Sequence, residues 1–276
     1  MPAADARSPH RLAVWGDPIA HSKSPALHAA AYRVLGLDWE YDRRRVSAAD
    51  LPSALSGLDG SWRGLSLTMP LKEQAFRAAA VRDRHATLTG AVNTLLLDGR
   101  PAGFNTDVGG IVDALADDGM RAASTVRILG AGATAASALV AAAEIGAERA
   151  EIRARRPDRA AALVDLGGSL GVTVSVASFD SPPTPVDLTV ATLPSGTSLP
   201  ADVALPLADD GGVLFDAAYA PWPSALAAVW SDAPVVSGLG MLLHQAIRQI
   251  RVFLHGDPAH VLDDEASVLA AMRAAL

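Results

Sequence analysis

The chain has 276 residues, 50% of them hydrophobic, which is enough for one large domain or two moderate domains with buried cores. Acidic residues outnumber basic ones by 30 to 23, and no basic run is longer than the arginines at 43–45, so we expect no nucleic-acid partner. The chain has no cysteine, which excludes disulfides, thiolate catalysis and Cys-ligated metals.

In the first part of the chain, short apolar runs alternate with helical patterns, which is typical of α/β architecture. The predicted strands cover residues 11–16, 40–46, 64–69 and 91–97. The predicted helices cover residues 25–37, 48–57 and 71–80.

A second α/β unit opens at 125–147 with a strand, a glycine turn and an Ala-rich helix. A strand at 149–154, a helix at 158–167 and three further strands follow. The last helix is predicted at 240–256, where apolar residues recur at helical spacing.

The hydropathy pattern contains no targeting or membrane signal. Residues 1–11 lack the apolar core of a signal peptide, and apolar stretches such as 136–143 are far shorter than the ~18 residues of a membrane span. We therefore expect a cytoplasmic protein without a membrane partner.

The turn at 128–135, with the sequence ILGAGATA, has the spacing of a dinucleotide-binding loop. Gly130 permits the turn, Gly132 lets a pyrophosphate approach the backbone, and the small Ala135 lets the helix pack closely on the strand. The N-terminus of the following helix offers free N–H groups and a positive dipole end to phosphates. A tight strand–helix turn without a ligand is the alternative interpretation.

Basic residues follow the second strand of this unit. An NAD-specific site usually carries an acidic residue about 20 positions after the glycines, where it holds the ribose hydroxyls. This chain instead has Arg155, Arg156 and Arg159, and guanidinium groups pair with a ribose 2′-phosphate. The pattern predicts NADP(H) as the cofactor, and a solvated helix start is the alternative.

The first part contains four polar stretches that the fold does not obviously require: residues 22–24, 68–72, 93–94 and 105–107. In an open α/β sheet, loops at the strand ends converge on one crevice. A lone lysine there, Lys72, without a metal or a cysteine, indicates proton transfer, and a nearby carboxylate would hold its charge.

These residues also have plain structural interpretations. Taken alone, Ser22 and Ser24 are typical of helix caps, since Pro25 opens the helix that follows. Lys72 alone is typical of a solvated helix start, and Gln245 of the polar face of the last helix. Four histidines share no ligand spacing with an acidic partner, so we predict no metal site: His21, His28, His85 and His244.

Taken together, seven motifs resemble those of the shikimate dehydrogenase family in order and spacing. They lie between residues 16 and 256 and read GDPIAHSKSP, LTMPLK, GAVNT, GFNTD, GAGATA, FDAAYAP and GLGMLLHQA. The resemblance implies an oxidoreductase of aromatic amino-acid biosynthesis, which reversibly reduces 3-dehydroshikimate to shikimate with NADPH.

The resemblance also implies roles for individual residues. Ser22 and Ser24 would bind the substrate carboxylate, assisted by Tyr219, and Lys72 and Asp107 would form the catalytic pair. Ring hydroxyls would be held by Thr68, Asn93, Asp107 and Gln245, and Lys72 would also touch substrate. The cofactor-binding positions would be Gly130, Ala131, Gly132, Ala133, Thr134, Ala135, Arg155, Arg156, Arg159, Thr192, Leu193 and Gly238. Asn105 is a weaker candidate than Asn93 for substrate binding, and we expect it to form a turn or brace a loop.

The chain departs from the usual family pattern at four places. Ala29 follows His28 where the family usually has asparagine, and Ser66 stands in for an asparagine that often touches substrate. Residues 154–156 read Ala-Arg-Arg in place of Asn-Arg-Thr, and 191–193 read Ala-Thr-Leu in place of Asn-Ala-Thr. These changes concern ring recognition and contacts near the nicotinamide, and they leave the proposed catalytic pair intact.

The predicted fold is α/β with two domains: an N-terminal substrate domain, a Rossmann-like NADP-binding domain, and C-terminal helices that return to the first. The expected boundaries are 1–106 with 239–276, and 107–238. We expect small-molecule partners only, and a monomer or homodimer. Two alternatives stay open: a quinate/shikimate dehydrogenase with broader cofactor use, and a non-catalytic NADP(H)- or metabolite-sensing protein on the same scaffold.

Overall fold

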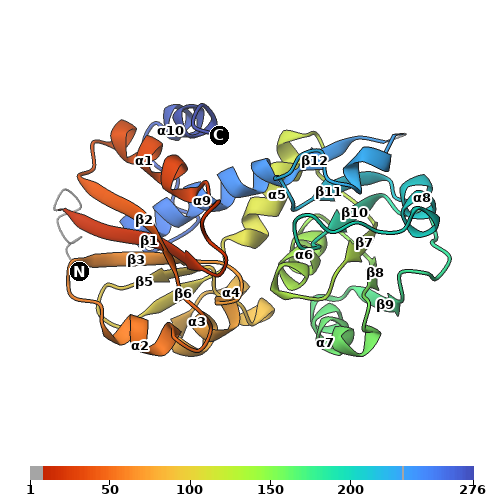
Figure 1. The fold of residues 1–276 in the computed structure, drawn as a ribbon, viewed down its shortest axis with the longest axis horizontal. Coiled ribbons are helices and arrows are strands. Elements are labelled where there is room, and N and C mark those ends of the chain that lie inside the picture. Colours follow the sequence, from red (N-terminus) through yellow and green to blue (C-terminus); the bar gives the residue numbers. More distant parts are fainter. Residues whose placement is uncertain (1–8, 232) are drawn as a thin grey trace. The chain divides into compact units, whose positions relative to one another are not determined.

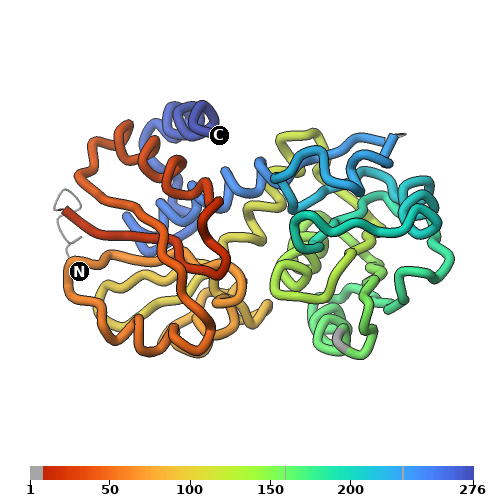
Figure 2. The backbone as a smooth tube through the Cα atoms, in the orientation of Figure 1, coloured from red at the N-terminus to blue at the C-terminus, as the bar shows by residue number. Residues whose placement is uncertain are grey.

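The computed structural model describes residues 9–231 and 233–276, and for Arg159 the backbone alone. The chain divides into two compact units, Met1–Thr106 with Leu242–Leu276, and Asp107–Met241. The second unit is therefore an insertion in the first, to which the chain returns in its last helices (Figure 2).

The first unit contains a six-stranded sheet in the order β2-β1-β3-β5-β6-β4. Three parallel neighbours form one half: β1 (His10–Gly16), β2 (Trp39–Arg45) and β3 (Trp62–Leu67). Shorter strands form the other half, where β5 pairs antiparallel with β3 and β6: β4 (Val81–Arg82), β5 (Thr94–Leu96) and β6 (Ala102–Phe104).

Helices cover both faces of this sheet (Figure 1). One face carries α1 (Ser24–Leu35), α9 (Gly238–His255) and α10 (Glu265–Arg273), and the other carries α2 (Leu51–Ser56), α3 (Lys72–Ala78) and α4 (Arg84–Thr89). Because side chains alternate along a strand, β1 supplies both cores: Leu12 packs with α1 and α9, whereas Ala13 and Trp15 pack with α2 and α3.

The structure differs from the sequence-based expectation between residues 80 and 105. The strand predicted at 91–97 is reduced to β5, and β4, β6 and α4 are additional elements. Strands of two or three residues are too short to show a period in the sequence, so only their pairing partners define them. The chain reverses between β5 and β6 through Gly99, whose φ of 79° favours glycine.

The second unit contains a six-stranded sheet in the order β12-β11-β10-β7-β8-β9, with every neighbouring pair parallel. Its strands are β7 (Thr125–Leu129), β8 (Arg149–Arg153), β9 (Thr173–Ala177), β10 (Leu188–Ala191), β11 (Val213–Asp216) and β12 (Val235–Ser237). Its helices are α5 (Asp107–Asp117), α6 (Ala133–Glu144), α7 (Ala161–Leu170) and α8 (Ala201–Asp209), with short 3-10 turns η1 (Pro157–Ala160) and η2 (Ala227–Val229). When the strands of this unit are numbered 1 to 6 in chain order from β7 to β12, their order across the sheet is 3-2-1-4-5-6. This is the doubly wound Rossmann order. The predicted fold class is confirmed.

Candidate active site

The backbone segments of three predicted residues, Thr68, Lys72 and Asn93, come together where β3 ends in the first unit. Thr68 follows β3 directly, and Lys72 opens α3 one short turn later. The Leu67 amide donates to the Asn93 carbonyl at 2.7 Å, and the Val92 amide donates to the Lys72 carbonyl at 3.0 Å. The backbone that carries Lys72 is therefore hydrogen-bonded to the segment that carries Asn93, although the two residues are 21 positions apart in the sequence.

Asn93 is held in one orientation. Its side chain is only 2% exposed, and its Oδ1 accepts from the Thr106 amide at 2.9 Å and from Thr94 Oγ1 at 2.8 Å. Its Nδ2 donates to Thr106 Oγ1 at 2.9 Å. Asp107, which is also buried, follows Thr106 directly and is the first residue of α5.

Ser22 and Ser24 lie at the start of α1, and neither caps the helix. The N-cap residue is Lys23, and no side chain caps the first turn. The Ser24 amide donates to Ser22 Oγ at 3.3 Å, which orients the two hydroxyl-bearing residues around the open helix end. Two hydroxyls beside the positive end of the α1 dipole form a suitable environment for a carboxylate.

The loop before α1 is held by charged residues of β2. Arg43 donates to the carbonyl oxygens of Ala20 and Ser22, and Arg45 pairs with Asp17 at 2.8 Å.

Gln245 lies on α9 and is buried, which excludes the solvent-facing alternative. Its Nε2 donates to the carbonyl of Leu242 at 2.9 Å.

Asn105 has the bracing role expected of it. Its Nδ2 donates to Thr89 Oγ1 at 2.8 Å and to the Ala91 carbonyl at 3.2 Å, so it holds the end of α4 against the segment before β5. The asparagine thus stabilises the turn from which Asn93 emerges.

The structure adds a buried polar group that the motifs did not identify: Tyr41, Ser66 and Gln249, with His28 beside them. In the sequence, Ser66 stands out only as a departure from the family pattern. His28 stands out only as the residue before a second departure, Ala29, and as one of four histidines without metal-ligand spacing. The one sequence signal for Gln249 is its position one helical turn after Gln245, which places two amides on the same face of α9. Burial lowers the pKa of His28 to about 3, a hydrogen bond to Gln249 opposing the shift, so the imidazole is neutral.

In the second unit, the glycine turn fits a phosphate-binding loop. Gly130 has a φ of 120°, and a Cβ there would lie 2.5 Å from Thr192 Oγ1. Gly132 is the N-cap of α6 without any side-chain cap, and a Cβ there would meet nothing within 4 Å. Gly132 thus leaves open space beside the start of α6, whose first turn contains Ala133, Thr134 and Ala135, and Ala131 lies between the two glycines.

The arginines around the end of β8 have different environments. Arg155 and Arg156 are exposed on the loop that follows the strand. Arg153 is fully buried and donates to Glu151 at 2.8 Å and to the Pro182 carbonyl at 3.0 Å, so it is structural. The predicted Arg159 side chain lies outside the described residues.

The remaining predicted positions follow β10, β11 and β12 in the same unit. Thr192 follows β10 and donates to the Leu129 carbonyl at 2.9 Å, and Leu193 comes next. Tyr219 follows β11, and burial raises the pKa of its hydroxyl. Gly238 opens α9, where a Cβ would lie 2.2 Å from the Ala217 carbonyl oxygen, so only glycine fits there.

Within the described ranges, no group of His, Asp and Glu side chains is arranged to hold a metal ion. In that same part of the chain, no helix combines the length and the apolar character needed to cross a membrane.

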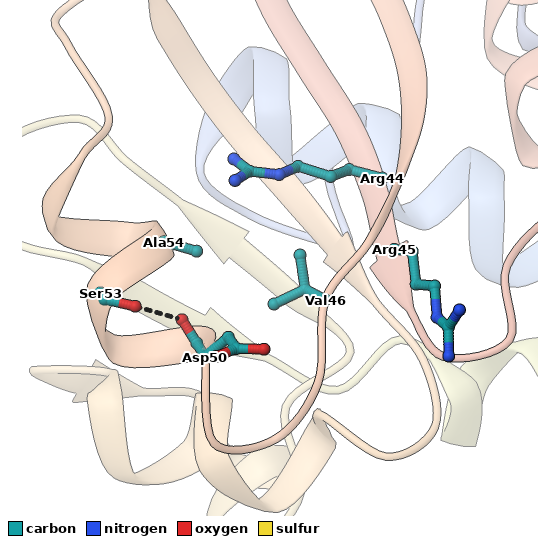
Figure 3. A pocket seen from close by; sticks show the side chains of 6 residues that line it. All are labelled: Arg44, Arg45, Val46, Asp50, Ser53 and Ala54. Carbon is teal, nitrogen blue, oxygen red and sulfur yellow. Dashed lines mark hydrogen bonds between the residues drawn. The ribbon is translucent and has the colours of Figure 1, made fainter.

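A surface pocket of about 340 Å³ lies between β2 and α2, away from all the predicted residues (Figure 3). Its lining residues are Arg44, Arg45, Val46, Asp50, Ser53 and Ala54. Both guanidinium groups are already engaged, Arg44 over the Trp15 ring at 5.3 Å and Arg45 with Asp17, and Figure 3 shows them directed apart. The pocket therefore offers no convergent cationic site.

Comparison with known proteins gives one consistent result. Residues 14–95 match the family described as shikimate dehydrogenase substrate binding domain. A shikimate dehydrogenase (NADP(+)) of Methanothermobacter thermautotrophicus is 35% identical over 263 residues, covering 90% of this chain and 92% of that protein. A shikimate dehydrogenase (NADP(+)) of Methylobacterium radiotolerans is 37% identical, covering 86% and 88%.

Solved structures agree with these sequence relatives. A shikimate dehydrogenase from Mycobacterium tuberculosis superposes with a TM-score of 0.85 at 41% identity, covering 96% of this chain and all of that one. A shikimate 5-dehydrogenase from Thermus thermophilus, solved in complex with NADP(H) and shikimate, gives a TM-score of 0.79 at 31% identity, covering 97% and 100%.

Proposed function

The chain belongs to the shikimate dehydrogenase family, and we infer from this that it catalyses the reversible NADPH-dependent reduction of 3-dehydroshikimate to shikimate. It is an NADP-dependent oxidoreductase of the shikimate pathway, which leads to aromatic amino acids. The structural observation that carries the assignment of residues is the backbone link between Lys72 and the Asn93 segment at the end of β3.

The residues of the second unit fit NADP(H). The open N-terminus of α6, after the turn at Gly130, suits the pyrophosphate, and exposed Arg155 and Arg156 suit a 2′-phosphate. The cofactor contacts proposed from the family pattern also include Thr192, Leu193 and Gly238. The chemistry that bound NADPH supplies is a hydride for the ring ketone.

We assign substrate binding to the polar residues of the sequence motifs. Ser22, Ser24 and the start of α1 bind the carboxylate, with Tyr219 assisting. Thr68, Asn93, Gln245 and Asp107 hold the ring hydroxyls. A site built to pair hydroxyls rejects molecules that lack them, because its buried polar groups would then stay unpaired.

Lys72 moves the proton. The ketone oxygen gains negative charge during reduction, and the Lys72 ammonium donates a proton to that oxygen. In the oxidation of shikimate, the Lys72 amine takes the hydroxyl proton back. Asp107 accepts hydrogen bonds from the lysine and from a ring hydroxyl, which fixes their orientation.

The test is the absorbance of reduced nicotinamide, with shikimate or quinate as substrate and NADP+ or NAD+ as cofactor. Turnover with shikimate and NADP+ alone is the expected result. Comparable turnover with quinate or with NAD+ would instead indicate the broader quinate/shikimate enzyme and would remove the specific role of Arg155. No turnover in any combination would contradict the catalytic assignment and favour a sensor on the same scaffold.

We further propose that the enzyme works in the cytoplasm, as a monomer or homodimer, with small molecules as its only partners. The absence of cysteine suits a reducing compartment, and the acidic balance of the chain disfavours nucleic acid. Light scattering coupled to gel filtration measures the oligomeric state directly.

A further inference from the structure

A chain of buried hydrogen bonds runs through the first unit and ends at Asn93. Tyr41 of β2 donates to Ser66 Oγ at 2.7 Å, and Ser66 donates to Gln249 Oε1 at 2.8 Å. Gln249 Nε2 then donates to the Asn93 carbonyl at 3.3 Å. Ser66, Gln249 and Asn93 are each no more than 3% exposed, so water does not compete for these bonds.

A second set of hydrogen bonds reaches the Gln249 side chain from α1. His28 Nε2 lies 3.3 Å from Gln249 Oε1, and His28 Nδ1 lies 3.0 Å from the Tyr32 hydroxyl. The neutral imidazole carries one proton, and an amide oxygen can only accept, so that proton is on Nε2 and Tyr32 donates to Nδ1. The His28 ring also stacks on the Tyr41 ring, with centroids 3.8 Å apart and an angle of 10°.

The Asn93 carbonyl leaves Gln249 a single orientation. A carbonyl oxygen can only accept, so the NH2 group of Gln249 must point toward Asn93, and its oxygen receives hydrogens from Ser66 and His28. The flipped amide would place its oxygen against the carbonyl oxygen of Asn93, two acceptors with no hydrogen between them, which a buried site does not tolerate. The hydroxyl hydrogen of Ser66 is used inside this network, so Ser66 does not replace the donor of the asparagine that the family often has there.

We propose that Gln249 is a positioning residue for substrate binding, which holds the backbone of Asn93 from the side of α9. The inference rests on the proposed function. The Asn93 carbonyl accepts from both the Leu67 amide and Gln249, so its position is set by β3 and α9 together. A shift of the Asn93 backbone would strain the bonds between its side chain and Thr106, and it would move the side-chain amide that is assigned to a ring hydroxyl.

The test is a steady-state comparison of Gln249→Met with wild type. Methionine fills a similar volume and suits a helix, but it neither accepts from Ser66 nor donates to Asn93. We expect KM for shikimate to rise roughly 10-fold, with KM for NADP+ unchanged and kcat little changed. Tyr41→Phe removes a bond one step further away and should raise KM for shikimate by roughly 2-fold.

Tyr32→Phe is the matched control. It removes a buried hydroxyl from the same core, at the outer end of the network, and leaves the Gln249–Asn93 bond in place. Its KM for shikimate should stay at the wild-type value even where its urea-unfolding midpoint falls as far as that of Gln249→Met. If Gln249→Met does not fold, Gln249→Asn replaces it, since its amide is one methylene too short to join Ser66 and Asn93.

The outcomes separate the inference from the function on which it rests. Wild-type turnover with an unchanged KM in the Gln249 variants would overturn the positioning role and leave the function intact. An equal rise of KM in Tyr32→Phe would show that the network affects substrate binding only through the general stability of the core. A wild-type protein that does not oxidise shikimate with NADP+ would instead remove the proposed function itself.

Discussion

Arginine provides almost all the basic groups of this chain. Among its 23 Lys and Arg residues, only Lys23 and Lys72 are lysines. Lys23 Nζ donates to the Leu276 oxygen at 2.7 Å, a role in which a guanidinium could serve as well. A guanidinium cannot give up its proton near neutral pH, whereas an ammonium can, so a lysine at position 72 suits the proton transfer assigned to it.

Lys72→Arg therefore tests proton transfer apart from charge. We expect kcat for shikimate oxidation to fall by about 100-fold or more, because positioned acid–base groups contribute about 10²–10⁴-fold. Binding of shikimate, measured by calorimetry, should weaken much less. Lys23→Arg is the control and should keep most of the activity; a Lys72→Arg enzyme as active as wild type would contradict the assignment.

The second residue-scale prediction concerns cofactor choice. Arg155→Ser should raise KM for NADP+ by about 10–100-fold, the equivalent of one lost charge-assisted hydrogen bond, and leave KM for NAD+ nearly unchanged. Arg149→Ser is the control, because Arg149 is an exposed arginine at the opposite end of β8. Equal effects of both substitutions would indicate a general loss of positive charge in place of a 2′-phosphate contact.

At the scale of elements, β7 and β8 are joined by a buried charge cluster. Glu151 binds Arg127 at 2.7 Å and Arg153 at 2.8 Å, and both guanidinium groups are fully buried. Burial alone would raise the pKa of Glu151, but hydrogen bonds from Arg153 and Arg127 hold it below its ordinary value. Burial also lowers the pKa of Arg127, and Glu151 opposes that shift.

Glu151→Gln should therefore destabilise the protein by about 3 kcal/mol, since two buried guanidinium groups would lose the carboxylate that both of them contact. Urea unfolding near neutral pH measures this value. Because the folded pKa of Glu151 is lowered, its contribution is present above the ordinary glutamate pKa and is lost as the pH falls. Glu148→Gln, at an exposed pair with Arg149, should change stability by less than about 0.5 kcal/mol.

The packing of α1 against β2 predicts a second pH effect, through His28. Its pKa of about 3 in the folded protein is below the ordinary value of 6.5, so the unfolded chain binds the proton more tightly. Stability should therefore fall as the pH drops from 6.5 to 3, by about 4 kcal/mol from this residue.

The comparison variant for this effect is His28→Phe, which keeps an aromatic ring beside Tyr41. Its unfolding free energy should be lower near neutral pH but should decline less steeply between pH 6.5 and 3. Identical slopes for the two proteins, measured by urea titration at each pH, would show that His28 is not the group that titrates.

At the scale of the whole molecule, the first unit is discontinuous in sequence. Its core on the α1 face takes more than half of its buried members from the last 35 residues, including Leu243, Ile250 and Phe253 of α9 and Met272 of α10. The second unit is one continuous segment with its own parallel sheet. The two units therefore depend differently on the end of the chain.

A chain that ends at residue 241 should lose the cooperative fold of the first unit and keep that of the second. Removing those apolar side chains exposes the α1 face of the sheet, and burial of apolar surface is the dominant favourable contribution to folding. Hydrogen exchange should show protected amides in β7 and β10 and unprotected amides in β1 and β3. Protection in β1 and β3 would contradict the dependence on α9 and α10.

The sequence by itself determined the features that arise from short segments. The strand–turn–helix around Gly130 and the alternation of apolar runs gave the α/β class, and the seven motifs gave the family, because their residues lie within a few positions of one another. Lys72 and Asn93 were predicted as site residues in the same way, each from its own motif.

Only the tertiary structure decided which polar residues meet across large sequence separations. Gln249 and Ser66 are 183 positions apart and bond at 2.8 Å, a relation that no local pattern carries. Arg153 and Arg155 are two positions apart, yet one is buried against Glu151 and the other is exposed, because the strand ends between them. Local patterns reflect backbone preference and burial period, whereas hydrogen-bond partners depend on which elements the folded core brings together.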